Sequence, residues 1–306
     1  MPKGITSLGG YIRRIEELQK KKSGELFFRG HTDSRYEPVP SLFRDSIIEP
    51  YERNMLYDAL TESPSEFQSD LSTFDKLVRA QHFGVKTRLL DLTTNPLIAL
   101  YFACEGQTSA RGRVLIFEID QEEAKYFLSD AISCKANLAH LTIDERRDIL
   151  REIVKQHNAI SHTLGARKKL PAIREEHPTD YRDLIENLNE HRVVKRLVRF
   201  IRSEKPHFQA EIDPIDLLKV DVVYPKKSNH RILAQSGAFF VFGLNKKLQA
   251  SMVKKVKVQT IDIGPGHKRS VLNSLSAVGV HEHSVYPELE RLSRKIGDKY
   301  SFPGDL

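Results

Sequence analysis

The 306-residue sequence is poor in cysteine and lacks the common signatures of metal and P-loop enzymes. Its two cysteines, Cys104 and Cys134, are not accompanied by a second Cys/His pair at metal-ligand spacing. We therefore expect reduced thiols and no metal centre. Neither HExxH nor GxxxxGK[ST] is present, which disfavours a zinc hydrolase and a P-loop enzyme.

Long hydrophobic runs are also lacking. The longest, NPLIALYFAC, ends well before the roughly 18 residues that are needed to span a bilayer. Residues 1–22, MPKGITSLGGYIRRIEELQKKK, contain neither an apolar core segment nor a small-residue cleavage site, which argues against export. We therefore expect a cytoplasmic protein with no membrane partner.

Acidic residues are fewer than basic ones. The formal net charge is +7 and the isoelectric point is near 9.2. This excess favours a polyanionic partner, although it is modest for a dedicated nucleic-acid-binding protein. With 40% hydrophobic residues, the chain can bury a sizeable core.

Strand-like segments lie towards both ends of the chain and are separated by a helical stretch. We predict an N-terminal helix in residues 1–22, a first half of the core in 23–120, and a second half with C-terminal helices in 206–306. Residues 121–205 are charged, poor in glycine and helical in period, which indicates a helical insertion. Strands that pair across such an insertion predict an α+β fold.

The stretch GELFFRGHTD places an arginine at the end of an apolar strand. A guanidinium group is never deprotonated in proteins and is costly to bury unpaired, so we expect a fixed anionic partner for Arg29. That partner is either a protein carboxylate or the phosphate of a ligand. Gly30 is expected to form the turn that follows.

The segment SPSEFQSDLSTFDKLVRAQHFGVKTRLLDLTTNPLIALYFA predicts a helix from Phe67 to Gly84 and a buried helix over Pro96–Glu105. Thr94 and Asn95 are candidate caps of the second helix. This second helix has two interpretations. It is a capped core helix, or its start is an anion-binding site, since the free N–H groups at the start of a helix can bind an anion. The polar residues on its approach are Gln81, His82, Thr87, Arg88, Asp91, Thr93 and Thr94.

Two further segments have two interpretations each. In NHRILAQSGAFFVFG, the two-residue period of a strand places Arg231 and Gln235 on the same face. These residues either line a site or are solvated residues of an edge strand beside a bulge at Gly237. In EHRVVKRLVRFIR, cations lie opposite an apolar helix face and form either a solvated surface or a phosphate-binding one. These cations are Arg192, Lys195, Arg196, Arg199 and Arg202.

Together, the segments FFRG, QHFGVKTRLLDLTTNPLIALYFA, RILAQSGAF and VYPELERLS resemble the FRG domain family, named for its phenylalanine-arginine-glycine signature. In that family the second motif reads Gln-His-aromatic-Gly, then Thr-Arg-Leu-Leu-Asp, then Thr-x-Asn-Pro, all of which this sequence retains. The resemblance runs from about Gly24 to Arg294, apart from the helical insertion. Bacterial members look like accessory or effector genes, which implies a toxin or phage-defence role.

A weaker similarity is to the ADP-ribosyltransferase fold of the arginine–serine–glutamate kind, which implies a split β-sheet core. In that fold the arginine of the first strand holds NAD phosphates, and a Ser/Thr-bearing strand leads into a helix with an Ala-x-x-Phe pattern. The matching residues here are Arg29 and Gly30, followed by Thr93, Thr94, Ala99 and Phe102.

The third element of that fold is a strand with a catalytic glutamate, which RILAQSGAF resembles except in the glutamate itself. Arg231 stands at that position, with Gln235 as the nearest polar residue on the same face. A cation there removes the electrostatic stabilisation of the transition state. Either Asp91 or Glu105 supplies the carboxylate instead, or Arg231 pairs with a phosphate at a different nucleotide site.

The resemblances imply a protein that binds an anionic nucleotide, with NAD as substrate, and cleaves its nicotinamide–ribose bond by hydrolysis or by ADP-ribosyl transfer to a macromolecule such as a nucleic acid. One alternative is a non-catalytic module that binds nucleic acid or a phosphorylated ligand. Another is a structural or regulatory protein whose motif residues hold the core together. The candidate catalytic residues are Asp91, Gln235 and Arg231. The candidate nucleotide-binding residues are Arg29, Gly30, His82, Arg88, Thr93, Thr94 and Asn95.

Overall fold

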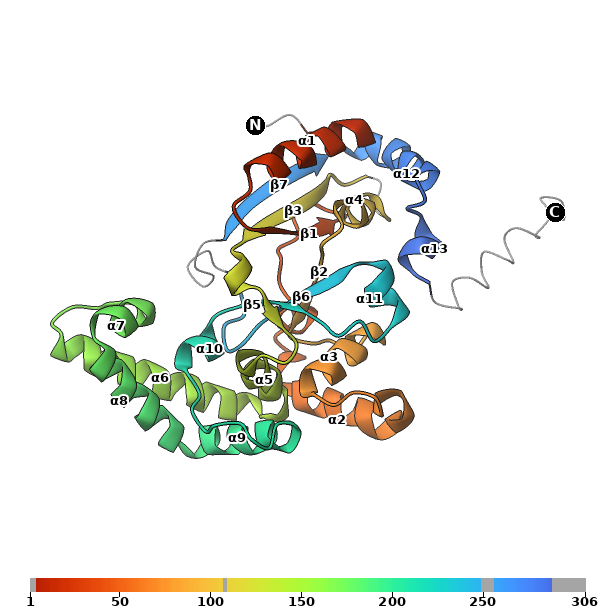
Figure 1. Cartoon of the computed structure of the whole chain (residues 1–306). Helices are drawn as coiled ribbons and strands as arrows, with labels where there is room; N and C mark the ends of the chain where they lie inside the picture. Colours follow the sequence, from red (N-terminus) through yellow and green to blue (C-terminus); the bar gives the residue numbers. More distant parts are fainter. Residues whose placement is uncertain (1–3, 107–108, 249–255, 288–306) are drawn as a thin grey trace.

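A computed structural model describes residues 4–106, 109–248 and 256–287 of the chain, and its centre is a seven-stranded sheet of order β4-β5-β6-β2-β1-β3-β7 (Figure 1). Neighbouring strands are antiparallel except for the parallel pair β4 and β5. The strands are β1 (Glu25–His31), β2 (Leu89–Thr93), β3 (Gly112–Ile119), β4 (Lys125–Tyr126), β5 (Asp221–Tyr224), β6 (Gly237–Val241) and β7 (Lys257–Ile263). Helices pack around this sheet, so the predicted α+β class is confirmed.

The sheet is nearly divided between β1 and β2. Along its whole length β1 aligns with β3, from Glu25 to His31, whereas its register with β2 holds the single pair Phe28 and Thr93. Continued antiparallel register would place Gly30 opposite Asp91, but the ladder ends before that position. We call this line the seam, because it separates β4-β5-β6-β2 from β1-β3-β7.

Three helices cover one face of the β1-β3-β7 side: α1 (Leu8–Lys21), α4 (Pro96–Cys104) and α12 (Lys268–Ala277). Residues alternate between the faces of a strand, so Leu26 and Phe28 of β1 join the core under these helices while Phe27 joins the core on the opposite face. The buried helix predicted from Pro96 is confirmed. The short helix α13 (Glu282–Val285) extends this layer.

The β5-β6-β2 side is covered by α2 (Glu52–Glu62), α3 (Thr73–His82), α5 (Asp130–Asn137) and α11 (His230–Ala234). The helix predicted from Phe67 to Gly84 is too long at its start. Ser72 caps α3 in a capping box with Asp75, and Leu71 before it is 77% exposed. A capping side chain that binds the free N–H groups stops the helix from extending backwards.

The strand predicted through RILAQSGAF is wrong in its first half. Residues His230–Ala234 form α11, because the Asn229 side chain accepts a hydrogen bond from the N–H of Ile232 and begins a helix. Ser236 then adopts a left-handed conformation with φ of 47°, and β6 begins at Gly237. The period-two argument for Arg231 and Gln235 therefore does not apply.

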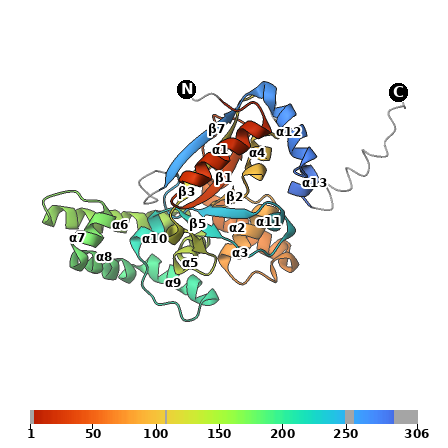
Figure 2. The same cartoon turned by 45° about the horizontal axis from the view of Figure 1, so that its top comes forward.

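The helices between α5 and β5 project to one side of the sheet in both views (Figures 1 and 2). They share an apolar core that includes Leu141, Ile149, Leu188 and Leu197. The helices of this part are α6 (Ile143–Thr163), α7 (Leu170–Glu176), α8 (Pro178–Glu190), α9 (Arg192–Glu204) and α10 (Pro214–Leu218). The short 3-10 segments of the chain are Ser41–Arg44, Glu49–Tyr51, Pro64–Phe67, Gln121–Glu123, Leu138–His140 and Pro265–His267.

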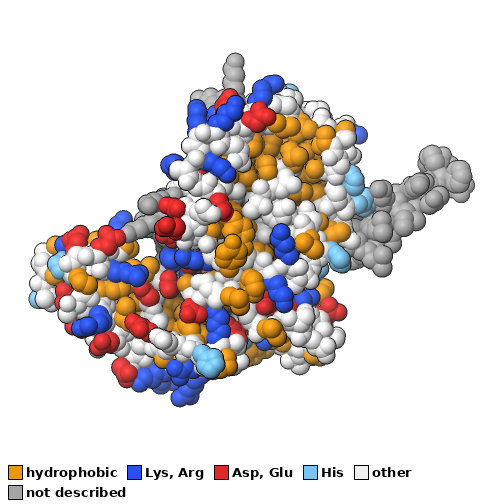
Figure 3. All heavy atoms as spheres, viewed as in Figure 1, with side chains coloured by type: hydrophobic (Ala, Val, Ile, Leu, Met, Phe, Trp, Pro, Cys, Tyr) orange, Lys and Arg blue, Asp and Glu red, His pale blue; other side chains and the backbone are white. Residues whose placement is uncertain are grey.

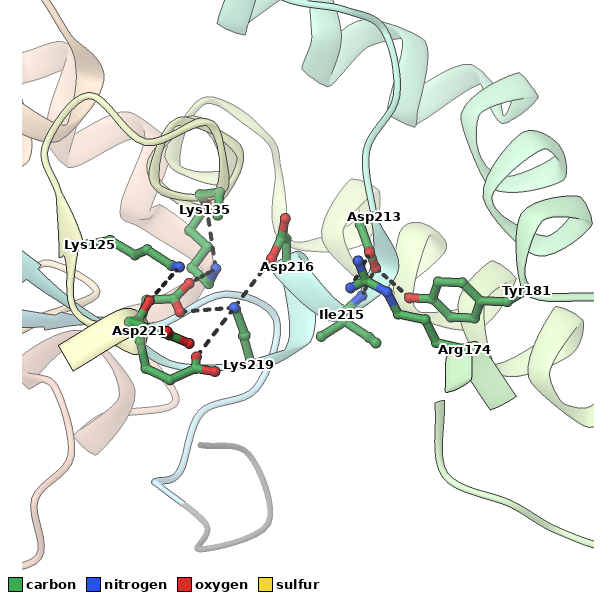
Figure 4. A network of polar contacts seen from close by, with 12 residues as sticks. Lys125, Lys135, Arg174, Tyr181, Asp213, Ile215, Asp216, Lys219 and Asp221 are labelled. Atoms are coloured by element: carbon green, nitrogen blue, oxygen red, sulfur yellow. Dashed lines mark hydrogen bonds and ion pairs between the residues drawn. The ribbon is translucent and has the colours of Figure 1, made fainter. Parts of the chain in front are cut away.

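Buried ion pairs connect these helices to the sheet (Figure 4). The fully buried Lys135 of α5 pairs with Asp221 of β5, and Lys219 lies 3.3 Å from the same carboxylate. Asp213, at the start of α10, accepts a hydrogen bond from the Tyr181 hydroxyl of α8. Removing one partner of a buried ion pair is strongly destabilising, so Lys135 and Asp221 fix α5 to the sheet.

No helix in the described part of the chain is both long and apolar enough to cross a membrane. The last helix predicted for the C-terminus, and most of VYPELERLS, lie outside the described residues.

At Gly30, β1 packs closely against the backbone of α4. A Cβ atom at this position would lie 2.1 Å from the carbonyl oxygen of Ala99 and 2.6 Å from the nitrogen of Ala103. Both are backbone atoms and cannot move aside. Gly30 lies inside β1 and pairs with Val114 of β3, so the turn predicted at Gly30 is wrong. Its function in the fold is this close packing, which also fixes β1 beside the seam.

We predict that Gly30→Ala lowers the free energy of unfolding by about 2–3 kcal/mol, because overpacking against backbone cannot be relieved by a rotamer change. The matched control is Gly9→Ala in α1, where an added Cβ meets nothing within 4 Å and helix propensity raises stability by up to about 1 kcal/mol. Urea unfolding of both variants measures the difference. Equal stabilities would show that β1 and α4 are not packed this closely.

Candidate functional site

A cavity of about 290 Å³ opens at the seam. Its walls come from the end of β1, the end of β2, the C-terminal part of α4, the 3-10 segment at Arg44, and α11. A smaller cavity of about 100 Å³ adjoins it and shares Asp91, Leu92, Arg231 and Gln235. We call the larger one the seam cavity and the smaller one the side lobe. The sequence-predicted residues that line the seam cavity are Arg29, Gly30, Asp91, Thr93, Arg231 and Gln235.

Arg29 crosses the seam where the ladder between β1 and β2 ends. Its Nη1 donates a hydrogen bond to the main-chain oxygen of Asp91 at 2.7 Å, and its Nε donates to Nε2 of His31 at 2.9 Å. Burial lowers its pKa to about 10, an effect that the nearby Asp91 carboxylate opposes, so it stays cationic at neutral pH. Within the described residues, no carboxylate lies within 4.0 Å of the Arg29 guanidinium.

His31 lies two residues after Arg29 and on the same face of β1. Because Arg29 donates to its Nε2, that nitrogen carries a lone pair and the ring is neutral with its proton on Nδ1. Burial, followed by the charge of Arg29, lowers the pKa of His31 to about 4. The buried histidine thus orients the arginine without adding a second positive charge.

Asp91 faces the cavity from β2 and is held by a chain of side-chain hydrogen bonds. Gln81 donates through Nε2 to Asp91 Oδ1 at 2.8 Å, and the Thr87 hydroxyl donates to Oε1 of Gln81. The structure thus accounts for two polar residues that crowd the approach to α4. They orient the carboxylate of Asp91, which lines both the seam cavity and the side lobe.

The two threonines of the same motif connect β2 to the turn after α11. The Thr93 hydroxyl donates to the main-chain oxygen of Gln235 at 2.6 Å, and the Thr94 N–H donates to that of Ser236 at 3.0 Å. Asn95 caps α4 by accepting a hydrogen bond from Leu97 N at 2.9 Å. Neither Thr94 nor Asn95 lines the seam cavity or the side lobe, so the prediction that both contact a nucleotide is not supported by their positions.

Arg88, which was predicted to bind the ligand, lines neither the seam cavity nor the side lobe. Arg88 is 1% exposed, donates from Nε and Nη2 to the two oxygens of Glu52, and donates from Nη1 to the carbonyls of Phe242 and Gly243. Arg146 pairs with the same Glu52 carboxylate. Residues alternate between the two faces of a strand, so Arg88 and Asp91 point to opposite faces. The guanidinium of Arg88 is bound by Glu52 and by main-chain carbonyls of the protein itself. His82 lines the side lobe rather than the seam cavity.

Arg231 and Gln235 reach the cavity from α11 rather than from a strand. The Arg231 guanidinium lies over the ring of Tyr286, 5.3 Å from its centroid, and Gln235 Nε2 donates to the main-chain oxygen of Val285 at 3.2 Å. The element that resembles the glutamate-bearing strand therefore places no carboxylate in the cavity. The carboxylates that line it belong to Asp91 and Glu105.

Among the lining residues that were not predicted to belong to the site, His31 and Arg44 carry basic side chains. A signal for His31 was available, because residues i and i+2 of a strand share a face and His31 follows Arg29 at that spacing. Arg44 lies in a segment after two prolines whose position depends on tertiary packing. No local pattern indicated that it reaches the seam.

The fold and cavity define an α+β protein with arginines from three separate segments around a carboxylate at a seam in the sheet. Residues 24–112 match the family model of the FRG domain, so the chain contains an FRG domain, as its motifs predicted. The match covers β1, β2 and α4. Neither the curated proteins nor the solved structures include a significant match to this chain.

We predict that His31→Gln flattens the acid dependence of stability. The folded-state pKa of His31 is lowered to about 4 from an ordinary 6.5, so the unfolded chain binds the proton first and stability is lost as pH falls from 6.5 to 4. Glutamine accepts the Arg29 hydrogen bond but takes up no proton. Wild type should lose up to about 3 kcal/mol relative to the variant across this range.

Melting temperatures at pH 4 to 7 check this prediction. The same replacement at the exposed His207 is the control. Parallel pH curves for wild type and His31→Gln would contradict a neutral, buried His31.

Proposed function

We propose that the seam cavity binds the phosphate group of a nucleotide, with NAD as the ligand. The observation that carries this proposal is the Arg29 guanidinium, which lines the cavity and has no carboxylate within 4.0 Å among the described residues. Arginine forks match phosphate oxygens in geometry and charge. Arg44 and Arg231 line the same cavity and add positive charge on its other walls.

The dimensions of the cavity suit one half of a dinucleotide. Ligand sites commonly enclose about 300–1,000 Å³, and the seam cavity of about 290 Å³ lies at the lower end of that range. The side lobe of about 100 Å³ is large enough for a small ring or carboxamide group. Asp91 lies on the wall that the two cavities share, which is where the bond between nicotinamide and ribose would lie with the ring in the side lobe.

We propose further that this ligand is cleaved between nicotinamide and ribose. The C–N bond breaks and its electron pair leaves with neutral nicotinamide, so positive charge develops on the ribose. A carboxylate oriented towards that charge lowers the barrier, and the hydrogen bond from Gln81 holds Asp91 in a single orientation. Water or a nucleophile of an acceptor macromolecule then bonds to the ribose carbon and loses a proton.

The second candidate is a non-catalytic module for a phosphorylated ligand, favoured by the arginines around the cavity. A nucleic acid would add contacts on α9, where basic side chains gather at the lower edge of the molecule (Figure 3). Part of that charge is already neutralised, since Arg196 pairs with Glu145 and Lys195 with Glu190. Release of nicotinamide separates the two candidates.

We predict that Arg29→Lys weakens the binding of ADP and NAD about tenfold, because lysine keeps the charge but loses the bidentate fork. The matched control is Arg88→Lys, which breaks the buried fork on Glu52 and should destabilise the fold by about 3 kcal/mol without changing affinity. Calorimetric titration and melting curves measure both effects. Unchanged affinity in Arg29→Lys would remove Arg29 from the site.

We predict that Asp91→Asn lowers the rate of nicotinamide release at least about a hundredfold while NAD affinity changes much less, since the charge is lost and the hydrogen bond from Gln81 is retained. Glu105→Gln is the matched control for the other carboxylate of the cavity. Loss of turnover in Glu105→Gln alone would transfer the role to Glu105. If the wild-type protein releases no nicotinamide, the proposed cleavage is wrong and the non-catalytic binding module is the function that remains.

A further inference from the structure

The segment Glu282–Tyr286 closes the outer side of the α11 wall. Its Val285 is fully buried and its Tyr286 is 8% exposed, and both belong to the core that includes α1, α4 and α12. From this anchored position the segment reaches residues that line the seam cavity on two different elements. We call it the C-terminal strap.

The ring of Tyr286 contacts α11 and α4 at the same time. The Arg231 guanidinium lies over the ring, 5.3 Å from its centroid, and the Tyr286 hydroxyl donates to Glu105 Oε2 at 2.9 Å. The ring also packs edge-on against Phe102, with centroids 6.0 Å apart. Arg231, Glu105 and Phe102 all line the seam cavity, so one side chain connects two of its walls.

The α11 wall needs such support because the helix has only five residues. Isolated helices of this length are unstable in water, so their position must come from capping and tertiary contacts. Asn229 supplies the cap, and Val285 of the strap accepts a hydrogen bond from Gln235 Nε2. The strap therefore holds both of the polar side chains that α11 contributes to the cavity.

An arginine cation that lies over the face of an aromatic ring is attracted by the ring, which restricts the position of the side chain. We propose that Tyr286 is a positioning residue of the seam cavity, which holds the positively charged side chain of Arg231 at the wall where the ligand binds. This inference rests on the proposed nucleotide binding. It assigns a function to a residue that is 193 positions after Thr93 and outside the matched domain.

A double-mutant cycle with ADP as the probe tests the ligand-dependent part. Tyr286→Phe keeps the ring and should bind ADP within about twofold of wild type, whereas Tyr286→Leu should bind about two- to thirtyfold more weakly, the scale of a cation–π contact. In an Arg231→Leu background the same Tyr286→Leu change should cost less than about twofold, because the coupling partner is absent. Additive losses would overturn the proposal. Tyr126→Leu in β4, outside the cavity, is the control for the general loss of an aromatic side chain.

A measurement without ligand separates this inference from nucleotide binding itself. Hydrogen–deuterium exchange of residues 230–237 should rise at least about tenfold in Tyr286→Leu and stay unchanged in Tyr286→Phe, because only the first loses the stacked ring. Unchanged exchange in Tyr286→Leu overturns the inference even if ADP binds to wild type. If wild type binds neither ADP nor NAD, the proposed function fails, and the exchange result alone decides whether Tyr286 holds α11.

Discussion

The hydrogen bond from Arg29 to the main-chain oxygen of Asp91 joins the two sides of the sheet where their own ladder stops. With a single aligned pair, Phe28 and Thr93, the strands β1 and β2 leave room at the seam for a cavity. A side chain that is always charged bridges this opening and is fixed by His31 on its own strand. The same guanidinium therefore contributes to the fold and supplies positive charge to the cavity.

The polar residues of the second FRG motif, within residues 81–96, form hydrogen bonds around that opening. Gln81 and Thr87 orient the Asp91 carboxylate, and Thr93 and Thr94 connect β2 to the turn after α11. Asn95 caps α4, which packs against Gly30. Most of these polar residues thus bind other parts of the protein, and their combined effect is to present Asp91 beside the arginines of the seam.

The wall formed by α11 is the part of the site that depends most on distant segments. Ser236 is in a left-handed conformation, which is unfavourable for a residue other than glycine and persists only when surrounding contacts impose it. Those contacts come from the threonines of β2 on one side and from Val285 and Tyr286 on the other. The conformation of the α11 wall therefore depends on the packing of the C-terminal strap.

The sequence alone determined the α+β class, the FRG domain, the cap at Asn95 and the helix that follows it, because apolar periodicity, capping chemistry and short motifs act over a few residues. It also indicated Arg29, as a charge that follows an apolar strand segment, and Asp91, as the carboxylate beside Thr93 and Thr94. Only the tertiary structure decided that Arg88 forms a buried ion pair with Glu52 and that Arg231 lies on a helix. It also decided that Arg44 lines the cavity and that Tyr286 contacts Arg231. The physical reason is that the partner of a charge is set by which distant segments pack together. Local sequence patterns do not contain that information.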